Sequence, residues 1–485
     1  MKKLSIFIIV AAVVLSGCSK SYYDINDNPN QSTNASVDLV LANALKVSAA
    51  YQINSFTVLS EWLGYWAPSG SYAISSSDGA SYKQTTDFAD GLWQSMYRNL
   101  EDYDYVEKTA TANGQYFYIA AAKTMKAYIY GQLVDMFNNI PYSQALKGTA
   151  MIQPKYDDAK TIYEDLSTQL GAAVTLFQRS DAVAVAAQDI LFAGNNAKWA
   201  QFANTLRLRL LMHQAYMSGR SAYIQTEINK IATNGSGYLT ADAAVNPGYS
   251  ASSGKQNPFY GSAYNTAGTF VQDFWRANKY PITWCQANGD PRYTRWYAAN
   301  SSGNYIGNII GSTSNAVGSV ASTWGPGVLV SNSQNAVILC AAESYLLQAE
   351  AGLNGYIANS PGTLVNSAIQ ANFTFLGAGS AAAYYTQNNK ETNYSVCTNN
   401  AERLACIIRQ KWAAFHDVTP METWSDFRRT GLPADMPISV HPNIDQPPTI
   451  PIRFLYATSE YQTNAANVNA MGSINHHTSK IFWMP

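Results

Sequence analysis

Two glutamates within one predicted helix have the residue type and spacing that hydrolytic chemistry requires. Glu343 and Glu350 lie seven residues apart in Gln334–Leu353, a segment with the apolar period of an α-helix. Seven residues make about two turns and place both carboxylates on one face, about 10 Å apart along the axis. Carboxylate pairs separated by roughly 5–10 Å hydrolyse glycosides. The same residues could instead be polar contacts between packed helices, and their spacing leaves both interpretations open.

The other candidates for catalysis or metal binding carry weaker signals. The five histidines form neither an HExxH motif nor a Cys–His metal spacing, and there is no GxSxG nucleophile elbow. The pair His476-His477 lies in a polar segment, so we expect both rings to be solvated. In Gly248–Gln256, five residues rather than four separate the glycines, and Gln256 replaces the Ser or Thr of a phosphate-binding loop. Apart from the glutamate pair, these patterns therefore predict no catalytic residue, no metal site and no cofactor.

Aromatic residues are abundant and recur in two loop-like stretches. The chain has 33 tyrosines and 11 tryptophans, and flat rings with a polar tip suit recognition surfaces. Gly64–Phe88 is rich in Ser and Gly, and the helical period disappears from about residue 237 to 331. Aromatic residues in such loops either contact a ligand or fix the loop to the scaffold. We expect the ligand-binding surface to contain Trp66, Tyr72, Tyr82, Trp284, Trp296 and Trp324.

Composition excludes some partners and bounds the architecture. Only 13% of the 485 residues are charged, the formal net charge is −1, and no basic patch is evident. These properties argue against nucleic acid as a partner. The chain is also longer than one simple core accommodates, which indicates several domains or an extended helical array.

The first residues carry an export and anchoring signal. A basic start is followed by the apolar run Leu4–Leu15, which is too short to span a bilayer. Leu15-Ser16-Gly17-Cys18 is similar to the lipobox of bacterial lipoproteins. We therefore expect residues 1–17 to be a signal peptide, Cys18 to be lipidated, and residues 18–36 to form a polar tether. The alternative is an ordinary secretory signal with an incidental cysteine.

Four other cysteines would remain after lipidation. Cys340 lies in an apolar segment and is expected to be a packing residue. Cys397 and Cys406 could form a disulfide in an oxidising compartment, but their spacing cannot establish it.

The clearest scaffold element is Gln115–Leu146. One face of this predicted helix is bulky and apolar, whereas Ala120, Thr124, Ala127 and Gly131 form a stripe of small residues on the other. A helix packed on both sides belongs in a layered array of helices. Further helices are expected at Asp38–Gly64, Phe88–Lys108, Tyr156–Phe177, Ala197–Met217, Ala222–Ala232, Gly362–Phe375, Asn400–Ala414 and Pro420–Arg429. The scaffold would cover about 37–236 and 332–432, with a loop-rich insertion at 237–331 and an extended tail at 433–485.

Dispersed motifs then indicate a family. They include Asn139-Ile140-Pro141-Tyr142, Asp290-Pro291-Arg292, Gln348-Ala349-Glu350-Ala351, Gln410-Lys411-Trp412 and Arg428-Arg429. In this order, and after a lipobox, they resemble the SusD/RagB outer-membrane lipoproteins of Bacteroidetes, nearest the SusD-like subgroup. The resemblance covers nearly the whole chain.

The resemblance implies a mainly α fold, with about four tetratricopeptide-like helix pairs supporting a loop-rich, aromatic-rich face in a single body at 37–485. It implies a lipid-anchored protein on the exterior of the outer membrane that binds glycans or other oligomeric nutrients and caps a SusC-like TonB-dependent transporter. It also makes Glu343 and Glu350 structural, so no enzyme activity is expected.

Three classes of function remain to be distinguished. The favoured class is a nutrient-binding lipoprotein whose exposed rings stack on sugars, with peptides or other oligomers as alternative ligands. A surface glycoside hydrolase would need a carboxylate pair beside the aromatic residues. A helical-repeat adaptor would bind only other proteins, in a groove on the helices themselves.

Overall fold

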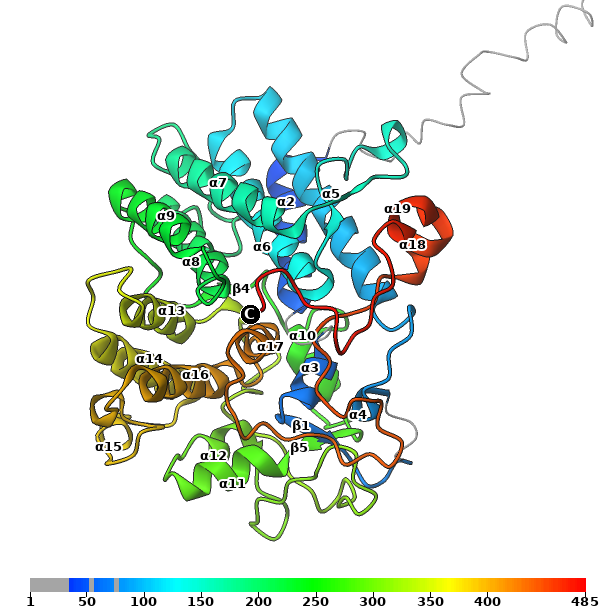
Figure 1. Ribbon diagram of the computed structural model, residues 1–485, viewed down its shortest axis with the longest axis vertical. Coiled ribbons are helices and arrows are strands. Elements are labelled where there is room, and N and C mark those ends of the chain that lie inside the picture. The colour runs from blue at the N-terminus through cyan, green and yellow to red at the C-terminus, as the bar shows by residue number, and fades with distance from the viewer. Residues whose placement is uncertain (1–34, 52–55, 74–77) are drawn as a thin grey trace, which may run out of the picture.

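The computed structural model describes residues 35–51, 56–73 and 78–485, and it is mainly helical (Figure 1). In the N-terminal half, each long helix packs on the next one along the chain. These helices are α2 (Val37–Ala50), α5 (Asp90–Ala112), α6 (Tyr116–Phe137), α7 (Ala159–Phe177), α8 (Asn196–His213) and α9 (Ser221–Asn234). The expected helical-repeat scaffold is therefore confirmed.

The C-terminal helices continue this row. Helix α13 (Ala341–Leu353) packs on α8, on α14 (Pro361–Leu376) and on α16 (Asn400–Phe415), and α16 packs on α17 (Pro420–Thr430). Three predicted helices differ from the structure. Tyr156–Phe177 begins with a two-residue strand, Tyr156–Asp157, before α7 starts. Asp38–Gly64 contains α2 and a separate α3 (Thr57–Trp62), and Gln334–Leu353 begins with strand β8 (Ala336–Leu339) before α13 starts.

Helix α6 is buried on both sides, as its two stripes predict. Its tyrosines Tyr118, Tyr128 and Tyr130 lie in the core. A Cβ atom added at Gly131 would lie 3.3 Å from Leu210 Cδ2 on α8, so the absence of a side chain allows the two helices to approach closely. After α6 ends, β2 (Ile140–Pro141) pairs with β3 (Tyr156–Asp157).

The two loop-like stretches form one region (Figure 1, lower part). Strand β1 (Trp66–Pro68) pairs with β5 (Trp275–Ala277) in antiparallel register, with Pro68 opposite Trp275. Strand β6 (Tyr297–Ala298) pairs with β7 (Thr323–Trp324), and β4 (Ala243–Val245) pairs with β8. Short helices complete this region: α4 (Asp78–Ser81), α10 (Pro258–Ala263), α11 (Lys279–Ala287) and α12 (Tyr293–Trp296). Elsewhere, α15 (Ala382–Tyr385) and the 3₁₀ turn η5 (Tyr394–Val396) pack on α14, and the 3₁₀ turn η4 (Gly148–Ala150) lies between β2 and β3.

The segment after residue 433 returns across the N-terminal helices and contains two short helices, α18 (Thr458–Thr463) and α19 (Ala465–Asn469). Phe454 N donates a hydrogen bond to Met136 O at 2.9 Å, and Trp483 Nε1 donates to Asp135 Oδ1 at 2.8 Å. Trp483 is fully buried. The tail therefore completes the core over α6.

The predicted anchor, Cys18, and the signal peptide lie outside the described residues, as does most of the tether. Within the described ranges, no helix is both long and apolar enough to cross a membrane. Cys285, Cys340, Cys397 and Cys406 are buried free thiols, so the structure does not contain the bridge that Cys397 and Cys406 could have formed.

Candidate ligand-binding surface

Five of the six aromatic residues expected to bind a ligand are buried. Trp66, Tyr82, Trp284, Trp296 and Trp324 are at most 7% exposed, whereas Tyr72 is 43% exposed. A ring that stacks on a ligand must present one of its faces. The expectation of exposed rings is therefore wrong for these five residues, and it holds for Tyr72 alone.

Specific contacts explain why three of the five are covered. Trp296 stacks on the His416 ring, with centroids 4.5 Å apart and planes 2° from parallel. The Tyr82 hydroxyl accepts a hydrogen bond from Ser439 N at 3.0 Å. Trp284 Nε1 donates to Glu391 Oε2 at 2.6 Å. These side chains fix the loops to the scaffold, which is the alternative role that loop aromatic residues can have.

Trp66 and Trp324 have a different role, because they back an aromatic surface. Their ring centroids are 5.0 Å apart in an edge-to-face arrangement. Trp66 also lies 5.8 Å from the ring of Trp275, and Trp324 lies 6.4 Å from Phe270. Such contacts between offset rings are favourable beyond the area that they bury. The buried pair therefore supports the half-buried rings in front of it.

We call the accessible part of this surface the aromatic wall: Tyr72, Tyr260, Tyr264, Phe270, Phe274 and Trp275. Tyr72 is exposed and the other five are half-buried. The wall has two groups of rings, one in contact with Trp66 through Trp275 and the other in contact with Trp324 through Phe270. On one side Tyr72, Phe274 and Trp275 form successive ring contacts at 5.1 and 4.7 Å. On the other, Tyr260 stacks on Tyr264 at 4.8 Å and Tyr264 contacts Phe270 at 5.2 Å.

Close backbone contacts hold the loops that carry the wall. Ser69 N donates to Phe274 O at 2.7 Å, and Gly70 N donates to Ala316 O at 2.9 Å. A Cβ atom at Gly70 would lie 1.9 Å from Asn315 O, so only glycine permits this approach. The loop that carries Tyr72 is therefore fixed against the loop around Asn315.

Polar side chains accompany the rings. Gln272 Oε1 accepts hydrogen bonds from the backbone of Phe274 and Trp275, which sets the turn before β5. Asp273 pairs with the buried Arg276 at 2.6 Å while its own side chain is about half exposed. Burial lowers the pKa of the Arg276 guanidinium, although the Asp273 carboxylate acts in the opposite direction. Amide and carboxylate oxygens therefore lie beside the aromatic faces.

Most of this wall was missed by sequence reasoning. The stretch Phe259–Trp275 contains aromatic residues at 259, 260, 264, 270, 274 and 275, and this density is the signal that could have located it. The tryptophans expected to bind a ligand in the insertion, Trp284, Trp296 and Trp324, are instead buried.

Glu343 and Glu350 are fully buried and paired, so they have no access to a substrate. Arg209 Nε donates to Glu343 Oε1 at 2.7 Å, and Glu350 Oε2 accepts from Arg429 Nη2 at 2.7 Å and from Lys411 Nζ at 2.8 Å. Burial alone would raise the pKa of Glu350, but the charges of Arg429 and Lys411 outweigh it and lower this pKa to about 2. The structural interpretation of the two glutamates is confirmed.

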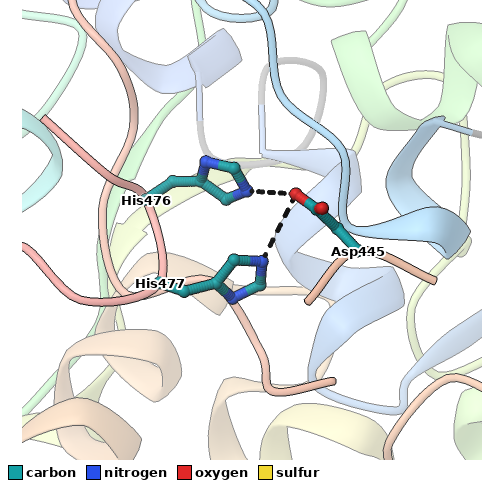
Figure 2. A group of neighbouring side chains, drawn as sticks. All are labelled: Asp445, His476 and His477. Atoms are coloured by element: carbon teal, nitrogen blue, oxygen red, sulfur yellow. Dashed lines mark hydrogen bonds and ion pairs between the residues drawn. The ribbon is translucent and has the colours of Figure 1, made fainter. Parts of the chain in front are cut away.

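The expectation that His476-His477 is solvated is wrong. The two residues are only 8% and 6% exposed, because the tail folds back on the body, and both rings face Asp445 (Figure 2). Burial, followed by the proximity of His476, lowers the pKa of His477 below its usual value.

Asp135, His213 and Glu422 form another buried group whose side chains are close enough together to hold a metal ion. Burial disfavours the charged imidazole, but the two carboxylates outweigh it and raise the pKa of His213 to about 9. Both ring nitrogens of His213 also have hydrogen-bonding partners, because Nδ1 lies 3.0 Å from the Tyr163 hydroxyl and Nε2 lies 3.0 Å from Glu422 Oε2. This group is therefore an ion-paired cluster of the core.

A helical scaffold that presents half-buried aromatic rings on one loop-rich face is the architecture of a helical-repeat binding protein. The family model described as starch-binding and associating with the outer membrane matches residues 29–457, and the chain belongs to this SusD-like family. No curated protein matches the sequence significantly.

Solved structures have the same fold. A chitin-binding SusD homolog from Flavobacterium johnsoniae is 21% identical, with 91% of this chain and 98% of that chain covered and a TM-score of 0.77. A SusD homolog from Bacteroides uniformis is 19% identical over 93% and 100% of the two chains, also with a TM-score of 0.77. One from Bacteroides fragilis is 21% identical over 93% and 100%, with a TM-score of 0.75. These similarities confirm the predicted tetratricopeptide-like, mainly α fold.

Proposed function

We propose that this protein is a cell-surface lipoprotein that captures oligosaccharides on the aromatic wall. The observation that carries the proposal is the two series of accessible rings, from Tyr72 to Trp275 and from Tyr260 to Phe270, which are connected through the buried Trp66 and Trp324. Membership of a family described as starch-binding supports the ligand class.

The chemistry of the wall suits a sugar. A pyranose ring has apolar C–H faces and a periphery of hydroxyl groups, so it can stack on an aromatic plate while its hydroxyls bond to nearby oxygens and amides. Trp275 and Phe274 would supply the plate, and the Asp273 carboxylate would accept hydroxyl hydrogen bonds. Two separated groups of rings would suit an oligomer better than a monosaccharide.

Capture without hydrolysis would be one step of uptake. Lipidation at Cys18 would anchor the protein to the outer membrane, facing the exterior, and a SusC-like TonB-dependent transporter would receive the bound oligomer. Asp273, which directly precedes Phe274 and Trp275 in the chain, is paired with Arg276, and Glu343 and Glu350 are buried. This arrangement supports binding rather than catalysis, because a glycosidase needs two accessible carboxylates.

Titration calorimetry with a panel of chitin, starch and other glycan oligomers, with peptides in parallel, tests the ligand class. A soluble Cys18→Ser protein should bind at least one oligosaccharide. In Trp275→Ala, the dissociation constant for that ligand should rise by about 10- to 100-fold, as for a central aromatic contact. Tyr461→Ala is the control, since Tyr461 is an exposed ring on α18 and is not part of the aromatic wall.

Two results would overturn the proposal. One is a ligand whose affinity is unaffected by Trp275→Ala, Phe274→Ala and Tyr72→Ala together, which would place its site elsewhere. The other is exclusive binding of peptides, which would change the ligand class. For the transporter, affinity capture from outer membranes with the lipidated protein should recover a large β-barrel protein.

A further inference from the structure

We propose that Asp445, His476 and His477 bind a divalent transition-metal ion of the Zn²⁺ class. In Figure 2 both imidazole rings point toward one carboxylate oxygen. His476 Nε2 lies 3.0 Å from Asp445 Oδ2, and His477 Nε2 lies 3.7 Å from the same atom. All three potential ligand atoms lie within 4.8 Å of one another.

These separations match those of a coordination sphere. Tetrahedral zinc holds nitrogen and oxygen ligands at about 2.0–2.2 Å, which places two ligand atoms about 3.3–3.5 Å apart. The two nitrogen–oxygen distances, 3.0 and 3.7 Å, lie on either side of this value. These two contacts would each need to change by only a few tenths of an ångström for the carboxylate and both imidazoles to hold one ion.

An unpaired buried nitrogen also points to a ligand. The His477 side chain is fully buried, yet its Nε2 has no hydrogen-bond partner within the part of the chain that the structure describes. Such a nitrogen is costly to bury without a partner. His477 Nδ1 lies 3.3 Å from Thr449 Oγ1, which orients the ring so that Nε2 faces the cluster. A partner on the far nitrogen is the usual support of a metal-bound histidine.

The donor set selects the class of ion. Two imidazole nitrogens and one carboxylate oxygen suit Zn²⁺, Ni²⁺, Co²⁺ or Cu²⁺, whereas Ca²⁺ and Mg²⁺ prefer oxygen alone. The Asp445 side chain is 34% exposed, so an ion could reach the site from solvent. Three protein ligands would leave a fourth position for water or for a donor atom from another molecule.

The ion would join segments that are far apart in sequence. Asp445 precedes α18 and α19, and the two histidines follow them, so coordination would close the tail into a loop. Asp445 N also donates to Ser81 O at 2.8 Å, next to the loop region that carries the wall. Metal binding to the folded state alone would therefore stabilise the tail on the body.

Titration of the untagged, metal-free Cys18→Ser protein with Zn²⁺ tests the proposal. We expect one ion per chain, with no comparable binding of Ca²⁺ or Mg²⁺. At a free Zn²⁺ concentration 100 times the dissociation constant, the Tm should rise by about 3 °C. Co²⁺ should give the visible absorption bands of a site with nitrogen ligands and low coordination number, and this readout requires no variant.

His477→Gln and Asp445→Asn should each raise the dissociation constant for Zn²⁺ at least about tenfold. Asp87→Asn, an exposed carboxylate outside the cluster, should leave it unchanged. Circular dichroism shows whether each variant folds. Absence of Zn²⁺ binding to the parent protein, binding that survives both substitutions, or a Co²⁺ spectrum of an all-oxygen octahedral site would overturn the proposal. None of these results depends on whether the protein binds glycans.

Discussion

Arg209 and Glu343 are joined across the centre of the molecule. Arg209 Nε donates to Glu343 Oε1 at 2.7 Å, and both side chains are almost completely buried. Arg209 belongs to α8 and Glu343 to α13, so this ion pair connects the N-terminal and C-terminal helices of the row. Burial raises the pKa of Glu343 to about 7, although the charge of Arg209 acts in the opposite direction.

Removing the arginine should be far more costly than neutralising the glutamate. Arg209→Met leaves Glu343 buried without its partner and should lower the free energy of unfolding by about 3–5 kcal/mol. Glu343→Gln resembles the protonated acid and should lower the free energy of unfolding by a smaller amount. Urea denaturation followed by circular dichroism measures both, and equal losses would contradict this account of the pair.

His213 should make stability depend on alkaline pH. Its folded pKa of about 9 exceeds the unfolded value of about 6.5. Folding thus favours the protonated form of His213. Its contribution to the free energy of unfolding, about 3 kcal/mol, is fully present below pH 6.5 and is lost as the pH rises through 9. Tm measured between about pH 7 and 9.5 should fall, and His213→Gln should reduce this slope. An unchanged slope in the variant would assign the effect to other groups.

Gly131 offers a test of the close approach between α6 and α8. Gly131→Ala should be nearly neutral, because the helix propensity gained, about 1 kcal/mol, offsets a 3.3 Å contact with a flexible leucine end. Gly131→Leu overfills the space and should cost about 1–3 kcal/mol. Urea denaturation of the two variants gives the comparison. A tolerated leucine would mean that the helices separate easily.

Gly70 lies in the loop that carries Tyr72, the exposed ring of the aromatic wall. Gly70→Ala places a methyl group into Asn315 O and must displace one of the two loops. We expect the affinity for the captured oligosaccharide to fall by about tenfold, or about 1.4 kcal/mol. Gly91→Ala on α5, where a Cβ meets nothing within 4 Å, is the control. Calorimetry measures affinity and thermal melting measures stability. An unaltered affinity would show that Tyr72 and its loop do not contribute.

The scaffold could be predicted from the sequence because the spacing of apolar and small residues along a helix indicates which of its faces are packed. Ala127 and Gly131 recur on the small face of α6, and this pattern alone indicated a close neighbour. The identity of that neighbour, α8, depends on contacts between distant residues. The same dependence on distant contacts explains why strand β8 could not be told apart from α13 in the sequence. Its four residues lie just before the helix and are equally apolar.

Burial in the loops could not be predicted in this way. Tyr82 lies in a Ser-rich stretch that looks solvent-exposed, yet it is covered by residues near Ser439, more than 350 positions away. His476 and His477 lie in a polar segment and are buried because the tail folds back. Local composition indicates which stretches lack a helical period, but only tertiary contacts determine which of their rings remain accessible.

The position of Trp483 has a consequence for how the chain is made. Its indole packs over α6 and bonds to Asp135, so the core of the N-terminal helices includes a side chain synthesised about 350 residues later. During translation those helices would lack their cover and expose apolar surface, the state in which nascent chains aggregate. The core over α6 can therefore close only after residue 483 has emerged.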